Sequence, residues 1–111
     1  MTSFMSIKTY SKLVRDNIPD IIVKDGKACK THVLSQKEYV DALHAKLEEE
    51  LKEYKDCYDI HELADIQEII NAIVKADGLS LKEFDAIREA KRKTNGGFDK
   101  KIFLESVNDK K

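Results

Sequence analysis

Apolar residues recur every three or four positions through the middle of the chain, a period typical of amphipathic helices. The pattern predicts three long helices, over about residues 35–56, 60–77 and 80–93. Ser35 and Ser80 each precede a glutamate by three residues, and this spacing is the capping box that opens a helix. Asp59 and Glu62 form a similar pair before the second long helix, and Gly78 is placed to end that helix.

Shorter elements are predicted on either side of the long helices. Pro19 fits the first turn of a short helix that Gly26 closes. Residues 28–34 and 101–107 contain β-favouring residues, and we expect two short strands that pair with one another. Residues 1–9 carry no strong pattern and are expected to be loosely ordered. The predicted fold class is mainly α, a bundle of about three main helices with a short N-terminal helix and a small two-stranded β-ribbon.

Length and composition indicate one domain spanning residues 1–111. The chain is 41% hydrophobic and 37% charged with one proline, which suits a helical globular protein. The formal net charge of −1 provides no general attraction to nucleic acid polymers or anionic membranes. No apolar stretch approaches the length of a membrane span, and we expect no secretion signal, because no apolar run follows Met1. Cys29 and Cys57 are too few for a disulfide framework, so a reduced, cytoplasmic chain is expected.

The candidate chemistry lies in two acidic pairs near the facing ends of the first two long helices. Glu50 and Glu53 are three residues apart, and so are Glu62 and Asp65, which places both side chains of a pair on one helix face. The break between the helices is short, so we expect the helices to fold back antiparallel with the two pairs facing each other. Four carboxylates would then converge.

Predicted burial distinguishes these carboxylates from ordinary acidic side chains on a protein surface. In helical projection Glu50 and Glu62 fall inside the apolar stripes of their helices, while Glu53 and Asp65 lie at the edges. A charged carboxylate on a buried face is unfavourable without a positive partner, and the sequence suggests no basic residue at matching positions of the two stripes. A divalent cation would supply that charge, and oxygen ligands favour Mg²⁺, Mn²⁺ or Ca²⁺ over zinc. The alternatives are a solvated acidic face and, for Glu62, capping of its own helix.

Basic residues elsewhere are candidates for binding an anion. Lys12 and Arg15 lie close to the start of the short N-terminal helix, a position suited to anions. Their other interpretation is two surface cations beside a helix cap. Lys91 forms a basic ridge with Arg88 and Arg92 on the third long helix, which compensation of the helix dipole also explains.

Three segments follow one another in an order typical of a known family. They are Lys12-Leu13-Val14-Arg15-Asp16-Asn17-Ile18-Pro19, then Glu49-Glu50-x-x-Glu53 with Glu62-Leu63-x-Asp65, and finally Lys91 before Gly96-Gly97-Phe98. Together they resemble the all-α, MazG-like nucleoside triphosphate pyrophosphatases, in particular the small phosphoribosyl-ATP pyrophosphohydrolase-like branch. The resemblance covers about residues 10–105. The gap between the acidic pairs is shorter than is usual in that family, and Asn17 stands where the branch often has lysine.

The resemblance implies Mg²⁺-dependent hydrolysis of a nucleoside triphosphate to the monophosphate and pyrophosphate, with Mn²⁺ as a substitute metal. By position it implies a set of catalytic and metal-binding carboxylates, namely Glu50, Glu53, Glu62 and Asp65. It implies phosphate-binding cations, namely Lys12, Arg15 and Lys91. Glu49 is a possible helper, and either Glu49 or Glu53 is the candidate general base.

The same resemblance implies a homo-oligomer, either a dimer or a tetramer, and a house-cleaning role in the nucleotide pool. One alternative is a phosphoribosyl-ATP pyrophosphohydrolase, which performs the same reaction on another substrate. A second alternative is a non-catalytic, nucleotide-binding helical oligomer.

Overall fold

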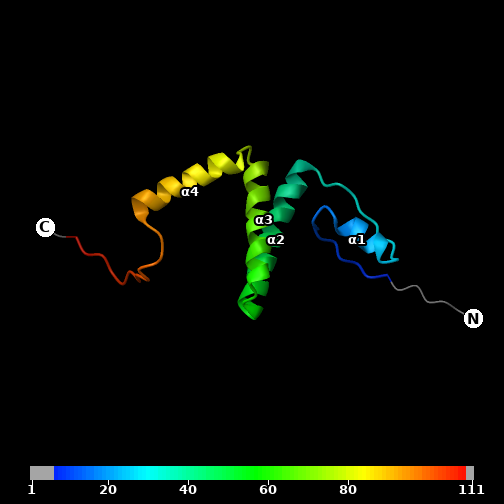
Figure 1. Ribbon diagram of the computed structural model, residues 1–111, viewed down its shortest axis with the longest axis horizontal. Coiled ribbons are helices and arrows are strands. Elements are labelled where there is room, and N and C mark those ends of the chain that lie inside the picture. The colour runs from blue at the N-terminus through cyan, green and yellow to red at the C-terminus, as the bar shows by residue number, and fades with distance from the viewer. Residues whose placement is uncertain (1–6, 110–111) are drawn as a thin grey trace, which may run out of the picture.

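The computed structural model describes residues 7–109, which form four α-helices. In chain order they are α1 (Ile18–Lys24), α2 (Gln36–Cys57), α3 (Ile60–Ala76) and α4 (Leu81–Asn95) (Figure 1). The prediction of a mainly α chain with three long helices and a short N-terminal helix is confirmed for these residues. The loose end predicted for residues 1–9 lies largely outside the described part, because the description begins at residue 7. None of the described helices combines the length and apolar character needed to cross a bilayer.

Reciprocal capping boxes begin α2 and α4, as predicted. The Ser35 hydroxyl accepts a hydrogen bond from the Glu38 N–H, and the Glu38 carboxylate accepts one from the Ser35 N–H. Ser80 and Glu83 make the same pair of bonds at α4. Hydrogen bonding to Ser35, through its side chain and then its backbone, lowers the pKa of Glu38. The Ser80 backbone and hydroxyl lower the pKa of Glu83 in the same way.

The start of α3 differs from the prediction. Asp59 is the N-cap residue, and its carboxylate accepts a hydrogen bond of 2.9 Å from the His61 N–H. The reciprocal bond from the Asp59 N–H to the Glu62 carboxylate is not among the hydrogen bonds of the described residues, so the predicted Asp59–Glu62 capping box is wrong. Asp59 alone caps the helix with its side chain, and the Glu62 carboxylate lies beside Glu50 of α2 instead.

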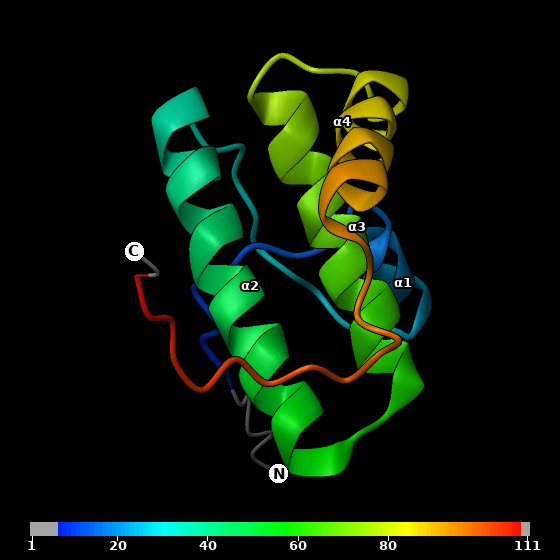
Figure 2. The same ribbon diagram turned by 90° about the vertical axis from the view of Figure 1, so that its left-hand side faces the viewer.

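A two-residue link joins α2 to α3 and makes them an antiparallel hairpin. α2 continues through Cys57, so only Tyr58 and Asp59 connect the helices. Tyr58 adopts the left-handed conformation, with φ 54° and ψ 28°, and its N–H donates a 2.7 Å bond to the Tyr54 carbonyl. The Tyr54 and Tyr58 rings meet edge to face with centroids 5.9 Å apart. The two helices run side by side as expected (Figure 2).

The buried core is small and belongs to this hairpin. Among the described residues, the buried apolar side chains are Leu43 of α2 and Ile69 and Val74 of α3. α1 lies on one side of the hairpin, and α4 leaves from the far end of α3 toward the other side (Figure 1). The radius of gyration is 20.4 Å, against about 13 Å for a compact domain of this length. The three long helices therefore do not close into a bundle within one chain.

The predicted two-stranded ribbon is wrong, because residues 7–109 contain no strand. Residues 28–34 connect α1 to α2, whereas residues 101–107 lie toward the opposite end of the molecule (Figure 1). Val33 is 97% exposed and Phe103 is 86% exposed, so neither segment packs against a partner. A β-favouring segment becomes a strand only when another strand satisfies its backbone groups. These two segments do not meet, and the described fold is all-helical.

Candidate metal centre

Carboxylates from α2 and α3 gather where the two helices face each other. Oxygens of Glu50, Glu62 and Asp65 lie within 4.8 Å of one another. Oxygens of Glu49, Glu50 and Glu53 form a second group and also lie within 4.8 Å of one another. Glu50 belongs to both groups, so it links the acidic residues of the two helices.

Glu50 is the most buried member of this acidic cluster. Its residue exposure is 8%, and its Oε2 atom has no hydrogen-bond partner. The Oε2 atom of Glu62 is likewise buried and without a partner. Burial raises the pKa of Glu50, and the neighbouring Glu62 carboxyl raises it further, with a smaller repulsion from Asp65. The protein therefore holds a carboxylate where its charged form is disfavoured.

Lys46 is a site residue that the sequence analysis missed. Its Nζ lies 3.8 Å from Glu50 Oε1, and the two side chains are only 19% and 10% exposed. The ammonium opposes the rise in the Glu50 pKa. The expectation that no basic residue shares the buried faces was therefore wrong, and the signal for Lys46 was its position one helical turn before Glu50. Its single charge leaves Glu50 Oε2 without a partner.

Lys12 and Arg15 lie at the rim of the acidic cluster. An Arg15 guanidinium nitrogen, Nη2, donates to Asp65 Oδ1 across 50 residues of sequence. Lys12 Nζ lies 3.6 Å from Glu49 Oε1. Both pairs are partly exposed, so each contributes only about 0–1 kcal/mol to stability. The two ion pairs matter mainly for position, because they hold two cations from the segment before α1 at the edge of the acidic cluster.

Lys91 is not brought to the acidic cluster within one chain. It is exposed in the second half of α4, and α4 begins at the opposite end of α3 from Glu62 and Asp65. Figure 1 shows α4 directed away from the hairpin. Of the seven site residues predicted from the sequence, six gather at one end of the hairpin, and Lys91 does not.

The donor set fits a hard divalent cation. All the available ligand atoms are carboxylate oxygens, and their mutual separations of up to 4.8 Å suit a common ion with oxygen ligands at about 2.0–2.6 Å. The buried, unpartnered oxygens of Glu50 and Glu62 are the independent sign of this fit, because buried polar atoms normally have partners. Glu50, Glu62 and Asp65 are the residues best placed to hold the cation, with Glu49 and Glu53 beside them.

Comparison with known proteins gives no match to any protein-family model, curated protein or solved structure.

Proposed function

We propose that this chain is a Mg²⁺-dependent nucleoside triphosphate pyrophosphohydrolase that acts in nucleotide-pool house-cleaning. The supporting observation is the pair of buried, unpartnered oxygens on Glu50 and Glu62, with Arg15 and Lys12 at the rim of the same cluster. Carboxylates suit the cation that accompanies a polyphosphate, and guanidinium and ammonium groups suit its phosphates. The sequence resemblance supplies the reaction, which converts a nucleoside triphosphate and water to the monophosphate and pyrophosphate.

Glu50, Glu62 and Asp65 would hold the metal, with Glu53 completing the set from the exposed side of α2. A Mg²⁺ ion held there would neutralise phosphate oxygens, orient the polyphosphate and lower the pKa of the attacking water. Arg15 is already held at Asp65, so a phosphate oxygen entering the cluster would meet its guanidinium without a large movement.

The chain's own residues would then handle charge and protons. Water attacks the α-phosphorus, the bond from that phosphorus to the bridging oxygen breaks, and pyrophosphate leaves. Glu49 or Glu53 accepts the proton of the water, since both belong to the cluster and neither is fully buried. Arg15 and Lys12 stabilise the negative charge that develops on the leaving pyrophosphate.

Two features of the whole molecule complete this proposal. A homo-oligomer, a dimer or a tetramer, is supported by the small core and the many exposed apolar side chains. A reduced, cytoplasmic setting is supported by Cys29 and Cys57, which are both free and exposed.

The test is pyrophosphate release from standard and modified nucleoside triphosphates and from phosphoribosyl-ATP, with Mg²⁺ and with a chelator. We expect chelator-sensitive release of pyrophosphate with the monophosphate as co-product. Glu50→Gln and Asp65→Asn should abolish turnover and keep the helical circular-dichroism signal. Glu48→Gln is the matched control, because Glu48 is exposed and outside both acidic groups. A folded wild-type protein that releases no pyrophosphate from any substrate would reject the enzyme and favour the non-catalytic binding protein.

A further inference from the structure

Cations of the chain itself face the inner acidic group, which consists of Glu50, Glu62 and Asp65. Lys46 Nζ lies 3.8 Å from Glu50 Oε1, and Arg15 Nη2 donates a hydrogen bond to Asp65 Oδ1. Two positive charges of the chain therefore meet three carboxylates. The buried Oε2 atoms of Glu50 and Glu62 still have no hydrogen-bond partner. A divalent ion entering the group would find free ligand oxygens but only one uncompensated negative charge.

The two cations differ in how firmly the fold holds them. Lys46 belongs to α2, and its side chain is only 19% exposed. Arg15 comes from the segment before α1, and its side chain is 53% exposed where it reaches Asp65. Residues 7–24, which include α1, contain no buried residue. Arg15 is therefore the cation that can leave the inner acidic group without exposing a buried side chain of its own segment.

Arg15 and a divalent ion compete for the same carboxylate. An ion at Asp65 Oδ1 would have to displace the guanidinium that this oxygen already binds. An ion at the other oxygen of Asp65 would still lie close to the guanidinium charge, and like charges repel strongly in a partly buried site. Without Arg15, the inner acidic group has two uncompensated negative charges, which match the charge of one divalent ion.

A phosphate group is the ligand that can draw Arg15 away from Asp65, because a guanidinium binds phosphate oxygens through two parallel hydrogen bonds. We propose that Arg15 exchanges Asp65 for a phosphate when substrate binds, so that the site takes its cation together with a polyphosphate and holds the cation only weakly without one. This inference rests on the proposed function, since it takes the inner acidic group as the cation site and Arg15 as a phosphate ligand. The exchange makes each ligand favour the binding of the other, and such coupling is reciprocal.

Binding of the metal without nucleotide tests the competition. Mn²⁺ alone is the probe, in phosphate-free buffer, because electron paramagnetic resonance counts the free ion directly. We expect Arg15→Ala to bind Mn²⁺ roughly tenfold or more tightly than the wild type, since a positive charge beside the ion is removed. Arg15→Gln should also bind it more tightly, because glutamine can donate to Asp65 without carrying a charge. Unchanged or weaker Mn²⁺ binding by both variants would overturn the inference.

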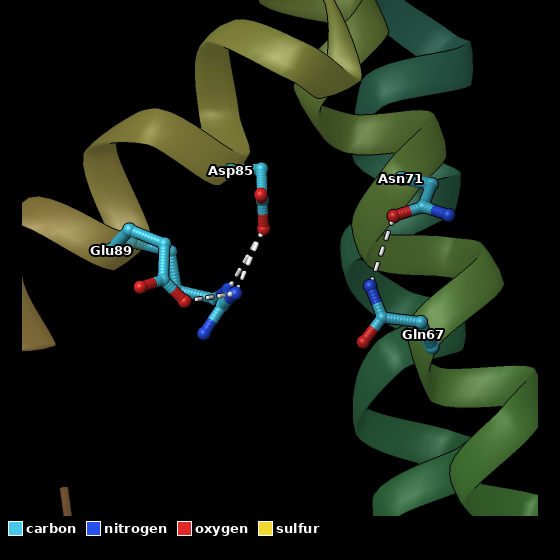
Figure 3. A network of polar contacts seen from close by, with 5 residues as sticks. Gln67, Asn71, Asp85 and Glu89 are labelled. Carbon is cyan, nitrogen blue, oxygen red and sulfur yellow. Dashed lines mark hydrogen bonds and ion pairs between the residues drawn. The ribbon is translucent and has the colours of Figure 1, made fainter.

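Arg88→Ala is the matched control. The Arg88 side chain has the same exposure as that of Arg15, 53%, and its partners Asp85 and Glu89 lie outside both acidic groups. Figure 3 shows the carboxylates of Asp85 and Glu89, which accept the hydrogen bonds of Arg88 on α4. This variant loses the same unit of charge, so it should bind Mn²⁺ as the wild type does. Tightening equal to that of Arg15→Ala would overturn the inference, because net charge alone would then explain the effect.

The Mn²⁺ complex of a nucleoside triphosphate analogue tests the exchange. A methylene group between the α- and β-phosphorus keeps the proposed reaction from splitting the analogue. We expect Arg15→Ala to bind this complex roughly tenfold or more weakly than the wild type, since a charged hydrogen bond to phosphate is lost. The two affinities should thus shift in opposite directions, whereas a damaged site would lose both. A shift of both affinities in the same direction would overturn the inference.

Neither binding measurement involves turnover, so the inference and the proposed reaction can fail separately. Opposite shifts in a protein that releases no pyrophosphate would support the exchange at Arg15 and reject the enzyme. Pyrophosphate release by a wild type whose Arg15 variants bind free Mn²⁺ no more tightly would support the enzyme and overturn the exchange. Circular dichroism checks that each variant keeps its helices.

Discussion

Replacing Glu50 with glutamine removes one negative charge from the interior of the α2–α3 hairpin. We expect the metal-free variant to be more stable than the metal-free wild type, although the same change removes a proposed metal ligand. At an effective dielectric constant of about 20, charges 4.8 Å apart interact by about 3.5 kcal/mol. Glu50 meets such a repulsion from Glu62, a weaker one from Asp65, which is paired with Arg15, and one attraction of about 4.4 kcal/mol from Lys46 at 3.8 Å.

The balance is a net repulsion of at most about 2–3 kcal/mol, to which the burial of the charge adds. Arg15 and solvent screen part of it, so we expect the unfolding free energy to rise by about 1–3 kcal/mol at neutral pH. That change corresponds to a rise in melting temperature of about 4–8 °C for each kcal/mol.

The sign of the pH dependence follows from the raised pKa of Glu50. Its folded pKa lies above the ordinary value of 4.5, so the wild-type protein binds a proton more tightly when folded. The stability from that protonation is fully present below the ordinary value and is lost as pH rises through the folded pKa. The glutamine variant has no such group. Its advantage over the wild type should therefore be largest at neutral pH and should vanish below about pH 4.5.

Thermal melts at fixed protein concentration, with chelator and with Mg²⁺, measure both effects. At a free Mg²⁺ concentration one hundred times the dissociation constant, the wild type should gain about 2.7 kcal/mol, whereas Glu50→Gln should gain little. Glu48→Gln on the exposed side of α2 should behave as wild type in both conditions. The reasoning would be refuted if metal-free Glu50→Gln were less stable than the wild type, or if Mg²⁺ stabilised both proteins equally.

Three further variants test other parts of the structure. Arg15→Ala should weaken binding of a Mg²⁺–nucleotide, measured by titration calorimetry, by about tenfold or more, as expected for a charged hydrogen bond worth about 1.5–3 kcal/mol. Unchanged affinity would mean that Arg15 does not bind the phosphates. Ser80→Ala should lower the unfolding free energy by about 1 kcal/mol in denaturant melts at neutral pH. Because the folded pKa of Glu83 is lowered, its capping contribution is present above the ordinary value of 4.5 and is lost as pH falls through the folded pKa. The loss of stability caused by Ser80→Ala should therefore be smaller in acid. A loss that stays constant with pH would contradict this. Lys46→Met should destabilise the metal-free protein by about 2 kcal/mol, because it leaves Glu50 without its cation, and Mg²⁺ should restore part of the loss. An unfolding free energy equal to that of the wild type in the presence of chelator would contradict the role of the buried pair.

The helix boundaries were predictable because their signals are local. The Ser35–Glu38 and Ser80–Glu83 capping boxes form within four consecutive residues, and the structure places the corresponding helix starts within one residue of the prediction. The ribbon was not predictable in this way, since a strand depends on a partner that can be distant in sequence. Val33 and Phe103 are exposed, so the β-favouring residues of these two segments have no strand to pair with in the described chain.

The gathering of acidic residues followed from the periodicity of the helices and the short link between them. The charge balance around them did not, because it depends on how far a flexible side chain can reach. Lys46 lies at the edge of an apolar stripe and extends one turn to Glu50. Glu62 had two possible partners in the sequence, its own helix start or α2, and in the structure its carboxylate lies with Glu50 and Asp65. Such competition between local and tertiary contacts is settled only by the folded chain.

The link between α2 and α3, which consists of Tyr58 and Asp59, determines which acidic residues meet. Each helical residue advances the chain by about 1.5 Å and turns it by about 100°. Lengthening α3 at its start by one residue would therefore turn Glu62 away from Glu50 and bring a different side chain into its place. An insertion or deletion at this link could abolish the cluster while leaving every acidic residue in the sequence. Link length is thus as much a determinant of the site's composition as the identities of the acidic residues themselves.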